Sequence, residues 1–392
     1  MKEAYKYITL CVAAVLGVAS CIYPFTPEEI PQEIGLLVME GEINAGIESS
    51  FTASESFSLL AENAKAKSLE LSDIYVESES GKKYTSYRTQ KSEDYKFEGD
   101  SKLSYIVDTR ALDKEERHKL VFSCKGKKYE TVWLEFVETP VIDSITYRVA
   151  DDKSKLDIMV HATGISDSLR YFKWEYREDW EFHAVYQQQY ILVNQVPVKL
   201  PPGVPENYYC WNKAFSSDIN LLSTAGLSEN RVKDHLITSI GCTNKRLMDL
   251  YSIEVYQKGI SEEAYKYWDT MLKNNEGTGG IFAPQPNELR GNIYCIDDPE
   301  EMVLGYIISC EVEKMRVYIK AQDHRIYKDP EDCTPFQWFP NPDKGEFEPS
   351  PTWGVYVYDE ETGDLFYVED RCLTCLRHGT KDKPDFWPTK HE

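Results

Sequence analysis

Short runs in which apolar and polar side chains alternate recur along most of this chain, and this period of two limits the possible folds more than any other feature. Neighbouring side chains of a β-strand point to opposite faces of a sheet, so each run predicts a strand with one buried face. Seven such runs lie between Gly35 and Glu138: Leu36–Met39, Phe51–Leu60, Ile74–Val76, Tyr95–Phe97, Tyr105–Val107, Leu120–Phe122 and Val132–Leu134.

Glycine-containing turns connect several of these runs. Ser80-Gly81-Lys82 and Lys125-Gly126-Lys127 predict hairpin tips, because glycine adopts positive φ without steric cost. About seven strands in about 100 residues predict a small β-sandwich of Ig-like or transthyretin-like type over residues 35–138. Pro140 cannot donate a ladder hydrogen bond, which favours a domain boundary near Thr139.

Residues 139–392 are predicted to form a second β-rich domain with a helical insertion at about 200–290, so the fold class is mainly β with added helices. Its strands are expected at Ile142–Arg148, Leu156–Val160, Tyr171–Trp180, Ser252–Gln257, Met302–Val312, Met315–Ile319, Trp353–Tyr358 and Leu365–Val368. In the third of these, Phe172 and Trp174 should face the core while Lys173 and Glu175 face solvent.

Two helices are predicted within the insertion. Ser228 can cap the first, whose apolar stripe is Val232, Leu236, Ile237 and Ile240. Ser261 can cap the second, whose stripe is Ala264, Tyr267, Trp268, Met271 and Leu272. We expect Trp268 to pack this second helix onto the sheet beside Phe282.

The N-terminus carries the features of a bacterial lipoprotein signal in residues 1–20. Lys2 and Lys6 precede an apolar run that is about 12 residues long and too short to span a bilayer. Ala19 and Ser20 are small and stand directly before Cys21, which is therefore predicted to carry lipid. The alternative is an ordinary secreted protein in which Cys21 merely falls near the cleavage site.

Residues 21–34 contain Pro24, Pro27 and Pro31 and are predicted to be an extended tether between lipid and fold. Several acyl chains hold a protein at a membrane nearly permanently. We therefore expect the protein to be held at a membrane by its lipid anchor, with the periplasmic and the cell-surface face both left open.

The acidic balance excludes some partners. The formal net charge is −22, so the chain repels nucleic acid and anionic lipid head groups. With 42% hydrophobic residues it is not a disordered acidic segment.

Cysteine usage predicts disulfides. Of ten cysteines, Cys11 lies in the signal, and Cys124 and Cys310 sit in apolar runs where they could be buried free thiols. Cys21 is expected to carry lipid, and outside the cytoplasm the remaining cysteines are expected to be oxidised. The candidates are Cys333, Cys372, Cys375, Cys210 and Cys242. Together with His378, three of them have the count of a zinc knuckle, but the compartment favours at least one disulfide that ties the C-terminal tail to the second domain.

An acidic and aromatic stretch is the one candidate site. Trp180, Glu178 and Asp179 are the candidate ligand-facing residues, a mixture found in sugar clefts. A glycosidase needs two carboxylates at a set separation, and on a strand such residues more often form a solvated face. The acidic segments Asp297–Glu301 and Asp359–Asp364 are expected to be a charged turn and a hairpin tip. The sequence holds no Walker, Rossmann, nucleophile-elbow or zinc-protease motif, so we predict no catalytic residue, no metal and no cofactor.

A series of short motifs resembles a known family. They are, in order, Tyr209-Cys210-Trp211, Glu263–Trp268, Gly279–Phe282, Gly291-Asn292-Ile293, Val303–Tyr306, the pair Cys372 and Cys375, and Lys383–Trp387. Together they resemble a Bacteroidota lipoprotein family classed as a domain of unknown function, whose members tend to be encoded beside TonB-dependent outer-membrane receptors. The resemblance implies an outer-membrane lipoprotein, an accessory to a transporter, and carries over no catalytic residue.

Three functions are compatible with these features. The first is a non-catalytic envelope lipoprotein that binds a ligand or docks on a TonB-dependent receptor. The second is an enzyme acting on glycan or peptide at the surface, and the third is a structural or adhesive surface protein. A deep pocket with converging carboxylates would favour the enzyme, and a broad exposed patch would favour docking.

Overall fold

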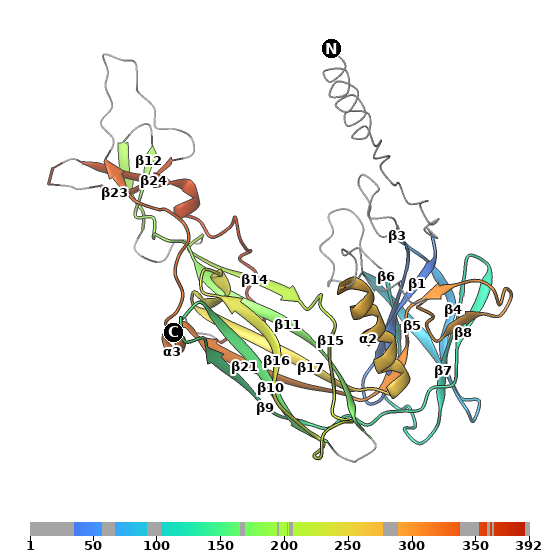
Figure 1. Cartoon of the computed structure of the whole chain (residues 1–392). Coiled ribbons are helices and arrows are strands. Elements are labelled where there is room, and N and C mark those ends of the chain that lie inside the picture. The colour runs from blue at the N-terminus through green and yellow to red at the C-terminus, as the bar shows by residue number, and fades with distance from the viewer. Residues whose placement is uncertain are drawn as a thin grey trace, which may run out of the picture.

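The computed structural model describes residues 35–56, 67–91, 103–164, 169–193, 196–201, 203, 207–276, 289–337, 353–358, 361–362 and 364–388. The signal, the tether with Cys21, and the predictions for Tyr95–Phe97 and Phe282 lie outside these residues. The described chain is mostly β, as predicted (Figure 1). In this part of the chain no helix is long and apolar enough to cross a membrane.

A large, nearly closed sheet forms the first module. Its strands are β1 (Leu37–Asn44), β2 (Ser49–Glu55), β3 (Lys67–Ser68), β4 (Leu71–Ser78), β5 (Lys83–Lys91), β6 (Leu103–Val107), β7 (His118–Cys124), β8 (Lys127–Thr131), β18 (Ile293–Cys295), β19 (Val303–Leu304) and β20 (Ile308–Cys310). The order is β18-β8-β7-β4-β5-β6-β2-β1-β19, and β20 and β3 add to β1 and β2. The last three strands come from residues 293–310, so the first module combines two stretches that are far apart in the sequence.

The predicted runs coincide with β1, β2, β4, β6 and β7, whereas β3, β5, β8 and β18 were not predicted. The single strand expected at Met302–Val312 is divided among β19, β20 and the start of β21. Gly81 and Gly126 have φ of +86° and +79° at the predicted hairpin tips between β4 and β5 and between β7 and β8. The strand predicted at Val132–Leu134 was wrong, because β8 ends at Thr131 and Leu134 makes only a single bridge to His118. Inside the sheet, Phe51, Leu120 and Phe122 are fully buried, which follows from the alternation of side chains along each strand.

Two facing sheets form the second module. One consists of β9 (Ile142–Val149), β10 (Lys155–Thr163) and β16 (Arg231–Gly241), and the other of β11 (Tyr171–His183), β14 (Tyr209–Phe215), β15 (Asn220–Ser223), β17 (Leu250–Gly259) and β21 (Val312–Lys320). Ile158 and Val160 of β10, in the three-stranded sheet, share a core with Phe172 and Trp174 of β11, in the five-stranded sheet. The predicted inward direction of Phe172 and Trp174 is thereby confirmed.

The helix predicted from Ser228 was wrong, because this segment forms strand β16. Val232, Ile237 and Ile240 are buried, but Leu236 is exposed. The pairing of β16 with β10 shifts register twice, so the buried positions lose the strict period of two and imitate a helical stripe. Tertiary pairing with β10 decided the outcome, and the β-branched residues of the segment suit a strand.

The second predicted helix is present as α2 (Glu262–Glu276). The Ser261 hydroxyl accepts a hydrogen bond from the Ala264 N–H at 3.2 Å, which is the expected N-cap. Ala264 and Tyr267 are buried, while Trp268 is half-buried. The Tyr267 hydroxyl accepts the N–H of Gly305 at 3.2 Å, so α2 also contacts the segment that returns to the first sheet (Figure 1).

A small lobe stands apart at the end of the second module that lies away from the first module (Figure 1). It contains β12 (Tyr190–Val193), β13 (Val196–Lys199), β22 (Phe336–Gln337), β23 (Trp353–Tyr358) and β24 (Leu365–Glu369). Strands β23 and β24 are antiparallel with Tyr358 opposite Leu365, which agrees with the predicted hairpin. The short helical segments are η1 (Lys245–Leu247), α3 (Ala321–His324) and η3 (Asp370–Cys372).

Acid should weaken the fold through the half-buried side chain of His235. Burial lowers the pKa of His235 to about 4, and its ring packs on Trp174 with centroids 4.5 Å apart. The unfolded chain takes up this proton near pH 6.5 and the folded chain does not, so this stability is present above pH 6.5 and falls as the pH drops toward 4. We expect a loss of about 2–3 kcal/mol across that range. Urea unfolding at a series of pH values measures it, and His235→Gln should show a shallower pH dependence. Equal slopes for the two proteins would contradict the assignment.

Candidate functional site

The residues expected to face a ligand are buried instead. Glu178, Asp179 and Trp180 are 2%, 1% and 8% exposed. The prediction that they form a ligand-facing or solvated surface was therefore wrong. The physical reason is that β11 is central in its sheet and is covered on both faces, by the opposing sheet on one side and by the C-terminal tail on the other.

Glu178 lies on the inner face of β11 and is engaged by neighbouring side chains. The Tyr251 hydroxyl donates to its carboxylate at 2.5 Å, and the Arg246 guanidinium lies 3.3 Å away. Burial raises the pKa of Glu178 although Arg246 opposes this effect. Arg246 also lies over the Trp180 ring, 5.0 Å from its centroid. The Glu178 carboxylate is thus enclosed between the sheets, while Arg246 reaches it from a partly exposed position.

Asp179 lies on the outer face, in an ion network. Arg177 donates two hydrogen bonds to its carboxylate, at 2.9 and 2.8 Å, and Arg316 lies 3.3 Å away. Arg316 also contacts Glu254 at 3.0 Å. Two guanidinium groups and two carboxylates thus neutralise one another on the outer face of the sheet.

The C-terminal tail, residues 373–388, covers this network. The Phe386 ring lies over Arg316, 3.9 Å from ring centroid to guanidinium. Trp387 is buried, and its indole N–H donates to Glu181 at 2.8 Å. Thr380 exchanges backbone hydrogen bonds with Trp211 of β14. The tail is therefore part of the fold, and it closes the outer face of the sheet.

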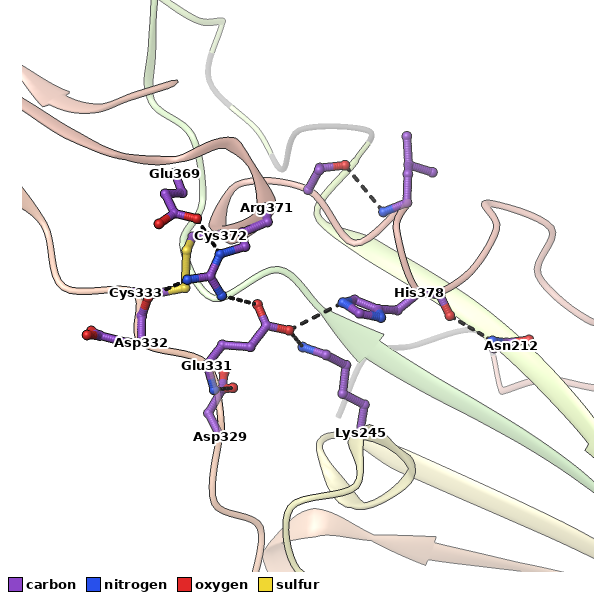
Figure 2. A network of polar contacts seen from close by, with 12 residues as sticks. Asn212, Lys245, Asp329, Glu331, Asp332, Cys333, Glu369, Arg371, Cys372 and His378 are labelled. Carbon is purple, nitrogen blue, oxygen red and sulfur yellow. Dashed lines mark hydrogen bonds and ion pairs between the residues drawn. A yellow bond between two sulfur atoms is a disulfide. The ribbon is translucent and has the colours of Figure 1, made fainter. Parts of the chain in front are cut away.

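Glu331 joins three segments of the chain beside this tail (Figure 2). Its carboxylate lies 3.0 Å from Lys245, 3.3 Å from His378 and 3.4 Å from Arg371. Burial would raise the pKa of Glu331, but the hydrogen bond and charge of Lys245 outweigh it and the pKa is lowered. The cluster ties η1, the loop before the lobe and the tail together.

Two disulfides fasten the same region. Cys210 is bonded to Cys375, and Cys333 to Cys372. The expected covalent tie between tail and second domain is confirmed, whereas Cys242, also a candidate, is a free thiol. All three cysteines of the zinc alternative are in disulfides, and the described residues contain no group of side chains that could hold a metal ion.

Removing the Cys333–Cys372 bond by the double change Cys333→Ser and Cys372→Ser should lower the free energy of unfolding by about 2–4 kcal/mol. The bond closes a loop of 39 residues, which restricts the unfolded chain. Denaturant unfolding measures the loss. Cys242→Ser is the matched control and should change stability by less than about 1 kcal/mol. A double variant as stable as the control would show that the bond contributes nothing.

A buried ion cluster lies at the junction of the two modules, and the sequence alone did not predict it. Lys258 of β17 is only 4% exposed, and its ammonium lies 2.5 Å from Glu42 of the first module and 2.6 Å from Glu175. Lys173 also pairs with Glu175 and lies over the Trp268 ring at 4.7 Å. The alternation along β17 assigns Lys258 to the outer face, as observed. No local signal showed that the first module covers that face.

The acidic turn at Asp297–Glu301 forms ion pairs within the first module. Lys127 contacts Asp298 at 3.1 Å and Glu301 at 2.6 Å. The N–H of Lys128 donates to Asp297 at 2.7 Å. The expected charged turn therefore anchors β18 to the hairpin of β7 and β8.

Comparison with known protein families identifies a family that covers most of the chain. A family model described as "Domain of unknown function (DUF4249)" matches residues 22–316. The match runs from the tether through the first module and ends within β21. No curated protein matches the chain significantly.

Proposed function

Because the chain belongs to the DUF4249 family, which has no assigned activity, we propose that it is a lipid-anchored, non-catalytic cell-envelope protein that binds a ligand or docks on a TonB-dependent outer-membrane receptor. The lipoprotein signal ending at Cys21 supports the anchor. The motif resemblance supports the receptor as partner. Two disulfides suit an oxidising compartment outside the cytoplasm.

One observation carries the non-catalytic part of this proposal. Glu178 and Asp179, the carboxylates that favoured an enzyme, are buried and paired with Arg246, Arg177 and Arg316. A glycosidase needs two carboxylates that reach the scissile bond from either side, and these two point to opposite faces of one strand. Their role in this fold is structural.

The contacts between the two modules support a docking role. Strands β18 to β20 follow the second module's β17 in the chain yet complete the first sheet, and Tyr267 and Lys258 also contact the first module, so the two modules are joined at several points. Surfaces that do not rearrange lose little conformational entropy on binding. A tethered protein of this kind suits the role of an accessory subunit.

Cys21→Ser should release the protein from the membrane. The sulfur atom of Cys21 would be bonded to the diacylglycerol, and a serine hydroxyl cannot replace the thiol in this lipid transfer. Cell fractionation and immunoblotting measure the distribution, with the wild type expected in the membrane pellet. Cys11→Ser, a change within the apolar run of the signal, is the matched control and should stay in the pellet. Membrane retention of Cys21→Ser would refute the anchor.

The receptor partner is tested separately. Wild-type protein carrying an affinity tag is purified from detergent-solubilised membranes of the native host, and co-purified proteins are identified by mass spectrometry. We expect a TonB-dependent receptor in near-equimolar amount, and much less of it with Cys21→Ser. Recovery of the anchored protein without any such receptor would refute the docking role while leaving the anchor intact.

A further inference from the structure

A ladder of alternating charges crosses the outer face of the first sheet, on neighbouring strands β5, β4, β7 and β8. Lys83 lies 3.8 Å from Glu77, and Lys119 lies 3.5 Å from Glu77 and 2.8 Å from Glu130. The register places Glu77 opposite both Lys83 and Lys119, and Glu130 lies diagonally from Lys119 because its direct partner on β7 is Val121. Two lysines and two carboxylates leave this strip without net charge, in a chain whose formal charge is −22.

Three aromatic side chains accompany the ladder, and each is positioned by one of its members. Lys83 lies over the Tyr75 ring at 4.4 Å and Lys119 over the Trp133 ring at 4.9 Å. Tyr294 of the edge strand β18 donates its hydroxyl hydrogen to Glu130. Trp133 and Tyr294 are nevertheless 38% and 41% exposed. All three rings are thus held in place before any ligand binds; Trp133 and Tyr294 keep part of their surface open to solvent, and Tyr75 is half-buried.

The aromatic side chains span the sheet. Tyr75, Val121, Glu130 and Tyr294 occupy one row across β4, β7, β8 and β18. Adjacent strands lie about 4.8 Å apart, so Tyr75 and Tyr294 are roughly 14 Å apart along the row. That length suits an extended chain of several small rings better than a single small molecule.

We propose that this face binds a neutral polysaccharide. The C–H faces of sugar rings pack on exposed aromatic rings, and sugar hydroxyls both donate and accept hydrogen bonds, which matches alternating carboxylates and ammonium groups. A ligand with net charge gains little from a neutral strip. A protein partner is disfavoured, because lysine and glutamate are depleted at the centres of protein interfaces.

This inference goes beyond the proposed function and does not depend on the lipid anchor or on a receptor. It is also distinct from a glycosidase, since the strip is assigned binding and no bond cleavage. The carboxylates Glu77 and Glu130 are paired with Lys119 and are not assigned any proton transfer.

Affinity electrophoresis of the full-length protein in mild detergent tests the proposal. Gels contain a soluble β-glucan, a xylan, a galactomannan or an α-glucan, with anionic polygalacturonate as a comparison. We expect at least one neutral polymer to retard the wild type and polygalacturonate not to. Joint replacement of Trp133→Ala and Tyr294→Ala should weaken the retardation at least tenfold without lowering the melting temperature by more than a few degrees.

Tyr87→Ala is the matched control. Tyr87 is 54% exposed on β5 and donates its hydroxyl hydrogen to Glu48, as Tyr294 does to Glu130, but it lies outside the row. The polymer that retards the wild type should retard the Tyr87→Ala variant to the same extent. The proposal is overturned if no neutral polymer retards the wild type, if the double variant is retarded as strongly, if Tyr87→Ala weakens binding equally, or if polygalacturonate binds best.

Discussion

Replacing Lys258 by methionine should lower the free energy of unfolding by about 3–5 kcal/mol, the range for removing one partner of a buried ion pair. Methionine keeps most of the side-chain volume, but it removes the ammonium group that Glu42 and Glu175 share and leaves Glu175 with Lys173 alone. Burial alone would raise the pKa of Glu175, but Lys258 and Lys173 outweigh it and hold the pKa well below its ordinary value. Because Glu175 is partly open to solvent, the lower half of the range is the expected result.

Denaturant unfolding of Lys258→Met measures this loss directly. Lys266→Met is the matched control, because Lys266 pairs with Glu262 on the exposed side of α2 and should contribute less than about 0.5 kcal/mol. Adding Glu42→Gln to Lys258→Met should recover part of the stability by removing one unpaired charge. A loss below about 1 kcal/mol for Lys258→Met would show that water enters the junction and replaces the ammonium group.

Trp174→Ala should cost about 3–5 kcal/mol, the range for deleting a large buried aromatic side chain. The indole is 0% exposed and stacks on Phe172 with ring centroids 5.6 Å apart. Its N–H donates to Gln257 at 2.9 Å, so the substitution leaves a buried carbonyl oxygen without this donor. The cavity and the lost hydrogen bond both lower the free energy of unfolding.

Thermal and denaturant unfolding of Trp174→Ala test this expectation, with Trp133→Ala as the exposed tryptophan control. The control should change stability by less than about 1 kcal/mol. Trp268→Ala should fall between the two, since Trp268 is half-buried and not enclosed as the helical stripe suggested. Equal losses for Trp174→Ala and Trp133→Ala would contradict the assigned core.

Prediction from sequence succeeded where the signal lies within a few neighbouring residues. Gly81 and Gly126 marked hairpin tips because the positive φ required there suits glycine. Ser261 and the stripe with Ala264 and Tyr267 identified α2, because capping and helical spacing are local properties. The same reasoning failed for β16, where register shifts against β10 broke the alternation.

The candidate site could not be inferred from local pattern. Glu178 and Asp179 stand on a strand that alternation alone would expose on one side. Their burial depends on Arg246, Arg316 and Trp387, which lie far away along the chain. A sequence shows which residues could pair, but their proximity depends on the fold.

The sequence by itself determined the high strand content, the hairpins and α2, because these follow from backbone propensity and turn chemistry. It also indicated disulfides, because the lipoprotein signal predicts an oxidising compartment. The tertiary structure alone decided that β18 to β20 complete the first sheet and that Cys333 pairs with Cys372. It also decided that Lys258 is buried between the modules. Each of these depends on which distant segments pack together, and that choice is made by burial of the whole apolar surface.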